Sequence, residues 1–171
     1  MAEASEWVTS NLDLIARDQP VLDVAAGRGR HAIYLAEQGR SVHAVDGNAQ
    51  ALAALDEHAR SHGLSIRTTQ VDLETGVVDL GLDAYGTILV FNYLHRPLVP
   101  ALVRALRPGG VLLYETFTSR QRERGHPRNP AFLLADGELP RLVAPLEVVR
   151  EREGEFDGRF IASVAARKSL L

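Results

Sequence analysis

Residues 21–29, with the sequence Val21-Leu22-Asp23-Val24-Ala25-Ala26-Gly27-Arg28-Gly29, decide the fold of this chain. A short apolar run that contains an acid passes through small residues and two glycines. It then enters a helical-looking stretch over residues 30–39. This order predicts a strand, a tight backbone turn and the first turn of a helix, which is where an open α/β sheet binds a nucleotide-like ligand.

The composition limits the classes of protein to consider. The chain has 171 residues, of which 46% are hydrophobic, so we expect a single domain over residues 1–171 with one core. The formal net charge of -3 makes nucleic acid an unfavourable partner. There is no cysteine, no apolar run of membrane-spanning length and no secretory pattern at the start. We therefore expect a cytoplasmic protein without a metal site or a membrane partner.

The rest of the chain predicts alternating helices and strands. Trp7, Val8, Leu12 and Ile15 have helical spacing, so we expect a helix over residues 5–17 that covers the sheet or, alternatively, closes over a ligand. Three further helices are predicted over residues 30–39, 49–62 and 97–106, the last one broken by the Arg-Pro-Gly-Gly sequence that follows it. The predicted strands are residues 21–24, 41–46, 66–71, 87–91 and 111–117.

The C-terminal part changes character. A short helix is predicted over residues 136–143, and strands over 147–156 and 159–166 are joined by the tight turn Asp157-Gly158. The expected fold is α/β, a Rossmann-like doubly wound seven-stranded mostly parallel sheet with a C-terminal antiparallel hairpin strand. Its parts are an N-terminal helix (1–19), a cofactor-binding core (20–117), a basic segment (118–135), and a short helix with the terminal hairpin (136–171).

Two ligands fit the glycine turn. Residues 27–32 satisfy the dinucleotide pattern G-x-G-x-x-A, and Asp46 follows at the spacing of a ribose-binding acid. Asp23 argues against a dinucleotide, because a carboxylate at the strand end would repel a pyrophosphate. S-adenosylmethionine carries an ammonium and a sulfonium and has no phosphate, so the acid favours this cofactor.

Three acids end three consecutive predicted strands at the ligand-binding edge. Asp23 would attract the methionyl ammonium, Asp46 would accept the ribose hydroxyls, and Asp72 would accept the adenine amino group beside the Leu73 backbone N–H. Small residues in the turn let the backbone approach the ligand closely. The predicted cofactor-binding residues are Asp23, Ala25, Gly27, Gly29, Asp46, Gly47, Asp72, Leu73 and Asn92.

These stretches together resemble a known family. Residues 23–29, 45–46, 71–73 and 106–112 are similar to the ordered motifs of class I S-adenosylmethionine-dependent methyltransferases, over about residues 20–117. Ala25 stands where the family often has its first glycine. Residues 27–36 further resemble the small tellurite-resistance-type branch. The resemblance implies S-adenosyl-L-homocysteine as product, and the branch implies small, soft or anionic methyl acceptors.

The candidate catalytic residues follow the predicted strand 87–91. Methyl transfer depends mainly on alignment of acceptor and methyl group. A base is needed only if the acceptor must lose a proton early, and His95 is the candidate because its ordinary pKa lies near neutrality. Asn92 and Tyr93 would orient the acceptor, and Glu115 near the end of the next strand is a candidate for the same task. The alternative for His95 is a structural role, capping the strand or bonding a carbonyl.

The segment 118–130 is basic inside an acidic chain. Arg120, Arg122, Arg124 and Arg128, with His126, predict a mobile lid that attracts an anionic acceptor. Glu123 is the single acid of the segment, and such a charge run is also typical of a solvated face. The predicted substrate-binding residues are Arg120, Arg122, Arg128 and Glu115, and Arg124 belongs to the same basic run.

The sequence therefore predicts S-adenosylmethionine-dependent methyl transfer to a small-molecule acceptor of the thiol, oxyanion or carboxylate class by direct displacement. An RNA-modifying methyltransferase and a non-catalytic S-adenosylmethionine-binding module are the alternatives, and a nicotinamide oxidoreductase is the most distant one. The oligomeric state is left open, with a homodimer among the options.

Overall fold

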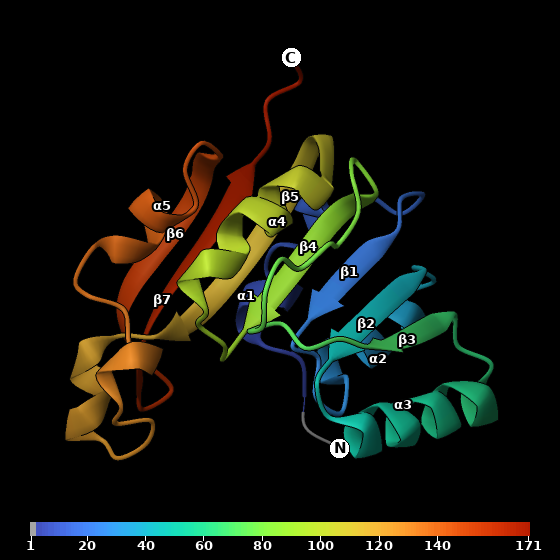
Figure 1. Ribbon diagram of the computed structural model, residues 1–171, viewed down its shortest axis with the longest axis horizontal. Helices are drawn as coiled ribbons and strands as arrows, with labels where there is room; N and C mark the ends of the chain where they lie inside the picture. Colours follow the sequence, from blue (N-terminus) through green and yellow to red (C-terminus); the bar gives the residue numbers. More distant parts are fainter. Residues whose placement is uncertain (1–2) are drawn as a thin grey trace.

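The computed structural model describes residues 3–171, so residues 1–2 of the predicted N-terminal unit lie outside the described part. Figure 1 shows one twisted sheet with helices on both faces. The sheet has seven strands in the order β3-β2-β1-β4-β5-β7-β6. The strands are β1 (Val21–Val24), β2 (Val42–Asp46), β3 (Ile66–Gln70), β4 (Tyr85–Phe91), β5 (Leu106–Phe117), β6 (Glu147–Phe156) and β7 (Arg159–Arg167).

Strands β1 to β5 are parallel, β7 runs antiparallel to β5, and β6 is antiparallel to β7. The predicted fold class is thus confirmed. The α-helices are α1 (Glu6–Thr9), α2 (Arg30–Glu37), α3 (Ala49–His62), α4 (Val99–Ala105) and α5 (Glu138–Leu142). Short 3₁₀ turns cover Leu12–Leu14, Arg96–Leu98, Ser119–Glu123 and Pro130–Phe132.

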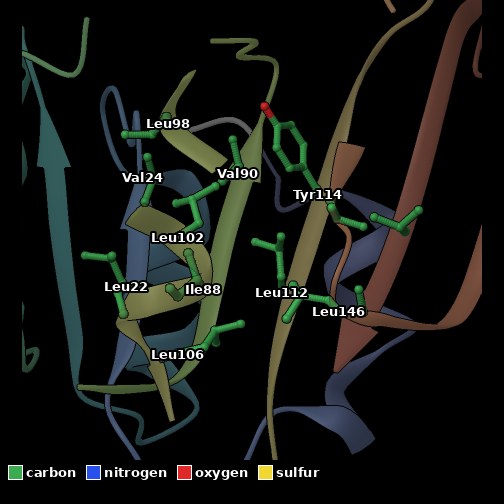
Figure 2. Packing of buried hydrophobic residues seen from close by; sticks show 14 of the residues in the cluster. Leu22, Val24, Ile88, Val90, Leu98, Leu102, Leu106, Leu112, Tyr114 and Leu146 are labelled. Atoms are coloured by element: carbon green, nitrogen blue, oxygen red, sulfur yellow. The ribbon is translucent and has the colours of Figure 1, made fainter. Parts of the chain in front are cut away.

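The strands divide the core into two layers because successive side chains point to opposite faces. Ile88 and Val90 of β4 pack with Leu102 of α4 in one cluster (Figure 2), whereas Leu89 and Phe91 pack in the other with residues of α1 and α2. The same alternation places Asp23 of β1 and Glu115 of β5 on the α1/α2 side of the sheet. Both acids are therefore positioned by the strand period.

The helix signals in the sequence are confirmed at α3. The Asn48 side chain accepts a hydrogen bond from the Ala51 N–H at 3.1 Å, and Gly63 ends the helix in the left-handed conformation with φ of 64°. None of the helices in residues 3–171 combines the length and the apolar character that a membrane span needs.

The prediction of one N-terminal helix over residues 5–17 is wrong. The structure has the single turn α1, a break, and a 3₁₀ turn at Leu12–Leu14. The Ser10 hydroxyl donates to the Glu6 carbonyl at 2.7 Å and the Asn11 amide donates to the Trp7 carbonyl at 2.7 Å. Such side chains compete with the backbone for helical hydrogen bonds, so the helix stops there. Trp7 is nevertheless buried against the sheet.

The boundary between α4 and β5 also differs from the prediction. The helix ends at Ala105, and the strand begins at Leu106 instead of Val111. The Pro108-Gly109-Gly110 stretch lies inside the strand, at a point where the pairing with β4 shifts register. Gly109 has φ of 81°, and a Cβ at Gly110 would lie 2.8 Å from the Arg107 carbonyl oxygen. The glycines thus permit an irregular strand start. They do not end the helix as predicted, because the chain is already extended at Leu106.

Candidate cofactor and acceptor sites

The turn after β1 has the backbone shape that its glycines predicted. Gly27 and Gly29 have φ of 58° and 78°, and Ala25 also lies in the left-handed region at 54°. An alanine in this region costs about 1–2 kcal/mol, so the turn holds Ala25 in a strained conformation at the sheet edge. The helix α2 begins directly after Gly29. Its first backbone N–H groups thus lie at the edge where the predicted acids meet.

Asp23 is 2% exposed, and its Oδ2 has no hydrogen-bond partner among the described residues. Burial raises its pKa to about 7, with the Ala32 backbone N–H and Arg30 acting in the opposite direction. A buried carboxylate with an unpartnered oxygen is costly unless a cation pairs with it. Asp23 therefore fits the ammonium group of an amino-acid-like ligand and does not fit a phosphate.

Asp46 links the β1 turn to the end of β2. Its Oδ2 accepts from the Gly27 N–H at 2.8 Å, and its Oδ1 accepts from the Asn48 N–H at 2.8 Å. Each carboxylate oxygen can accept a second hydrogen bond, so two vicinal hydroxyls of a ribose can still bind. The two backbone donors fix the orientation of the carboxylate before a ligand arrives.

A groove of about 490 Å³, the cofactor groove, is lined by five of the nine predicted cofactor-binding residues. It includes most of the residues predicted after β1, β2 and β3, together with one predicted as catalytic. The Asp72 side chain accepts from the Glu74 N–H at 3.0 Å, and Leu73 is buried. The groove is lined by Ala25, Asp46, Gly47, Gln70, Asp72, Leu73, Glu74 and Tyr93. The structure thus brings together Ala25, Asp46, Gly47, Asp72 and Leu73 as one surface. The other predicted cofactor-binding residues, Asp23, Gly27, Gly29 and Asn92, do not line this groove, and Asn92 lines a different one.

Asn92 and Tyr93 lie where β4 ends. Asn92 is exposed, has φ of 55°, and donates its backbone N–H to the Glu115 carbonyl at 2.9 Å. The Tyr93 hydroxyl is buried without a partner among the described residues. Burial and the nearby Glu74 carboxylate raise the pKa of Tyr93 to about 12. This hydroxyl therefore keeps its proton near neutral pH and can donate a hydrogen bond.

His95 is separated from these two residues. It precedes the 3₁₀ turn Arg96–Leu98 and lines a different groove of about 300 Å³, together with Val78 and Pro97. The structure does not place His95 in the groove of Tyr93, so its role as a base stays a prediction without support from this geometry.

Glu115 is buried to 1% exposure under the N-terminal segment. Its carboxylate accepts from the Ser5 hydroxyl at 3.0 Å and from the Ser163 hydroxyl at 2.6 Å. The Arg152 guanidinium lies 3.4 Å from the same carboxylate. The geometry gives Glu115 a structural partner set on the α1/α2 side, and its predicted contact with an acceptor stays untested.

His31 completes this buried polar network. Its Nε2 accepts from the Ser5 backbone N–H at 3.1 Å, and its ring lies 4.3 Å from that of Phe91. Burial and Arg30 lower the pKa of His31 to about 3, so the ring is neutral. The local sequence held no sign of this network, since its members come from five distant segments.

The basic segment 118–135 is anchored to the hairpin. The Gln121 Oε1 accepts from the Phe160 N–H at 2.8 Å, and the Thr118 N–H donates to the Phe160 carbonyl at 3.0 Å. Arg120 stacks 4.2 Å from the Phe160 ring centre, and Arg124 pairs with Glu155 at 2.6 Å. In Figure 1 the segment, coloured gold to orange, lies at the end of the sheet toward which β5 points.

Two of the arginines predicted to form the lid, Arg122 and Arg128, have exposed side chains. Arg122 donates to the nearby Ser119 carbonyl at 3.3 Å, and Arg128 is exposed. A mobile lid of arginines thus stays a prediction, while the segment itself has fixed contacts.

A third groove of about 460 Å³, the apolar groove, lies between this segment and the ends of β4 and β5. It was missed in the sequence because its walls come from three separate stretches. The only local signal was the apolar character of residues in an otherwise basic loop. The lining residues are Asn92, Tyr93, Leu94, Thr116, Phe117, His126, Pro127 and Phe132. Tyr93 lines this groove and also the cofactor groove, so these two grooves meet at the end of β4.

Comparison with known proteins now agrees with this geometry. A family profile described as "Methyltransferase domain" matches residues 21–110, a little more than half of the chain. The chain belongs to this methyltransferase family. The match covers β1 to β4 and the start of β5, which includes every strand end that carries a predicted cofactor-binding acid.

Two curated relatives are similar to this methyltransferase chain. The probable S-adenosyl-L-methionine-dependent methyltransferase TehB of Haemophilus influenzae is 30% identical over 87 residues, which is 51% of this chain and 30% of that protein. The glycine/sarcosine N-methyltransferase of Halorhodospira halochloris is 44% identical over 104 residues, 56% of this chain and 38% of that protein. The chain thus spans about a third of the length of these relatives.

Solved structures confirm the methyltransferase fold. The crystal structure of TehB from Haemophilus influenzae matches with a TM-score of 0.80 at 22% identity, covering 99% of this chain and 63% of that chain. A geranyl diphosphate C-methyltransferase from Streptomyces coelicolor, in complex with Mg²⁺, geranyl diphosphate and S-adenosyl-L-homocysteine, gives 0.74 at 16% identity, covering 95% and 78%. The similarity to TehB supports the predicted branch of the family.

Proposed function

We propose that this methyltransferase chain catalyses methyl transfer from S-adenosyl-L-methionine to a small-molecule acceptor by direct displacement. One observation supports the choice of cofactor most strongly, namely the buried and unpartnered Oδ2 of Asp23 at the end of β1. A cationic amino-acid head group satisfies this oxygen, whereas the pyrophosphate of a dinucleotide would be repelled by it.

The predicted cofactor-binding residues would hold the cofactor in order along the sheet edge, with Asp46, Asp72 and Leu73 in the groove and Asp23 buried beside it. Asp23 pairs with the ammonium group, Asp46 accepts from the ribose hydroxyls, and Asp72 with the Leu73 backbone N–H faces the adenine. S-adenosyl-L-methionine, when bound, supplies a methyl group on a positively charged sulfur. The protein's own task is to align an acceptor with that group and to exclude water from it.

Asn92 and Tyr93 are suited to this alignment. Both follow β4, which is the neighbour of β1 in the sheet, so they lie next to the strand end that carries Asp23. The Tyr93 hydroxyl stays protonated near neutral pH and has no partner among the described residues, so it is available as a hydrogen-bond donor and would not act as a base. A small acceptor fits because the groove beside Tyr93 has a volume of about 460 Å³.

The test separates cofactor binding from turnover. Calorimetry should show that S-adenosyl-L-homocysteine binds the chain and that NAD does not. A screen of small thiols, oxyanions and carboxylates should then show formation of S-adenosyl-L-homocysteine with at least one of them. Binding of NAD without binding of S-adenosyl-L-homocysteine would overturn the proposal, and cofactor binding without turnover of any acceptor would reduce the chain to a binding module.

A further inference from the structure

The groove between β4, β5 and the segment 118–135 has apolar walls. Leu94 follows β4, Phe117 ends β5, and Pro127 and Phe132 come from the segment. The Phe132 side chain is 49% exposed, an unusual position for a large aromatic group. An exposed aromatic ring on a concave wall is typical of a site that binds an apolar molecule.

This groove lacks the charges that an anionic molecule needs. Of the described residues that line it, only His126 can carry a positive charge. Arg120 stacks on Phe160, Arg124 pairs with Glu155, and Arg96 pairs with Glu138. An oxyanion that enters must give up its hydration, and such a loss is large unless charged donors replace the water. The walls offer no such set of donors.

The reactive end of the groove is defined by Tyr93, which also lines the cofactor groove. Asn92 and Thr116 add polar groups at the strand ends, whereas Phe132 and Pro127 lie on the loop side. A bound acceptor would therefore point its nucleophile toward the strand ends and its hydrocarbon body toward the loop.

We propose that the acceptor is a small thiol with an apolar, aromatic or branched aliphatic body, which packs against Phe117 and Phe132. This inference rests on the proposed function and specifies the acceptor of that site. The hydrocarbon body of such a thiol suits the apolar walls of the groove. A minor fraction of a thiol is ionised near neutral pH and its thiolate is a strong nucleophile, so no strong base or buried cation is required.

The chemical step balances without another reactant. The thiol loses its proton to solvent and the resulting sulfur anion forms a new S–CH₃ bond with one of its lone pairs. The bond between the methyl group and the donor sulfonium breaks, and its electron pair stays on the donor sulfur. A thioether and S-adenosyl-L-homocysteine, both neutral at sulfur, are the products.

The test compares acceptors that differ in charge and in the chemistry of their body. Benzyl mercaptan should be methylated with a kcat/KM at least about tenfold higher than 2-mercaptoethanesulfonate, and also higher than benzoate or selenite, with S-adenosyl-L-homocysteine formation as the readout. The charged thiol controls for the nucleophile, and benzoate controls for the aromatic body. Equal or faster turnover of the charged compounds would overturn the inference.

A pair of variants tests the groove itself. Phe132→Ala should raise the KM for benzyl mercaptan by about tenfold while the Kd for S-adenosyl-L-homocysteine stays unchanged. Phe132→Leu should restore most of the affinity. Val149→Ala, which truncates another partly exposed apolar side chain on β6, should change neither value.

The possible failures are distinguishable. If S-adenosyl-L-homocysteine binds but no apolar thiol is methylated, or if Phe132→Ala leaves the KM unchanged, the inference fails and the proposed cofactor stands. If S-adenosyl-L-homocysteine does not bind the wild-type chain, the proposed function fails and the inference fails with it.

Discussion

The cofactor groove and the apolar groove meet at Tyr93 but are built in opposite ways. The cofactor groove is formed by turns that directly follow β1, β2 and β3, and its acids are oriented by backbone N–H groups, as for Asp46 and Asp72. The apolar groove needs the end of β5 and a loop held by the hairpin. This difference indicates that local strand-turn-helix units form the cofactor groove, whereas the apolar groove depends on long-range packing.

The largest expected effect concerns the cofactor side of this comparison. Asp23→Ala should weaken binding of S-adenosyl-L-methionine by about 100-fold or more, because the charge-assisted contact to the ammonium is lost. The thermal midpoint of the free protein should not fall strongly, since the substitution also removes a buried unpaired acid. Calorimetry and a thermal melt measure the two quantities.

Asp136→Ala serves as the control, because this exposed acid lies outside both grooves and should leave the Kd unchanged. If Asp23→Ala retained the affinity of the wild type, the glycine turn would have to be reinterpreted as a dinucleotide site.

The next effect concerns the buried network around Glu115, near the end of β5 and outside both grooves. Glu115→Ala should lower the free energy of unfolding by about 3 kcal/mol, because Arg152 and two serine hydroxyls lose a buried partner. Urea denaturation measures the change. Glu147→Ala, at an exposed acid on β6, should change it by less than about 0.5 kcal/mol.

A different outcome would change the role of Glu115. If Glu115→Ala kept the stability of the wild type but raised the KM for the acceptor, Glu115 would be an acceptor-binding residue, as the sequence suggested.

The pH dependence gives a smaller effect. The pKa of Asp23 is about 7 in the folded protein, against an ordinary value of 3.8. The folded chain therefore keeps a proton that the unfolded chain releases. The resulting stability is present below pH 4 and is lost as the pH rises toward 7. Only the ionised acid pairs with the ammonium, so the Kd for S-adenosyl-L-methionine should fall about tenfold between pH 5.5 and 7.

Asp23→Asn should remove both pH effects, because the amide does not titrate in this range. A binding curve of Asp23→Asn that kept the slope of the wild type would assign the titration to another group.

The sequence predicts the cofactor side of the molecule better than the acceptor side. The strand period, the glycines and the Asn48 cap are local signals, and they were sufficient to predict the sheet, α3 and the grouping of Asp46 with Asp72. The break after α1 was missed because it depends on the side chains of Ser10 and Asn11 bonding backward to the helix. Helical spacing alone contains no information about such bonds.

The acceptor side could not be predicted for a different reason. The spacing of the arginines in residues 118–130 indicated a charged lid, but their direction is decided by distant partners such as Phe160 and Glu155. Likewise, Phe132 reads as an ordinary loop residue until the segment is placed against β5. Contacts between distant segments leave no periodic pattern in one sequence.

The smallest expected effect concerns the apolar groove. Arg122→Gln combined with Arg128→Gln should change the KM for benzyl mercaptan less than about twofold at low salt, because neither side chain lines the groove. Steady-state kinetics at low and high ionic strength make the measurement, since a long-range attraction would weaken as salt is added. A large rise in KM for an anionic acceptor at low salt, absent for benzyl mercaptan, would restore the arginine lid. It would also show that charge, and not the aromatic wall, selects the acceptor.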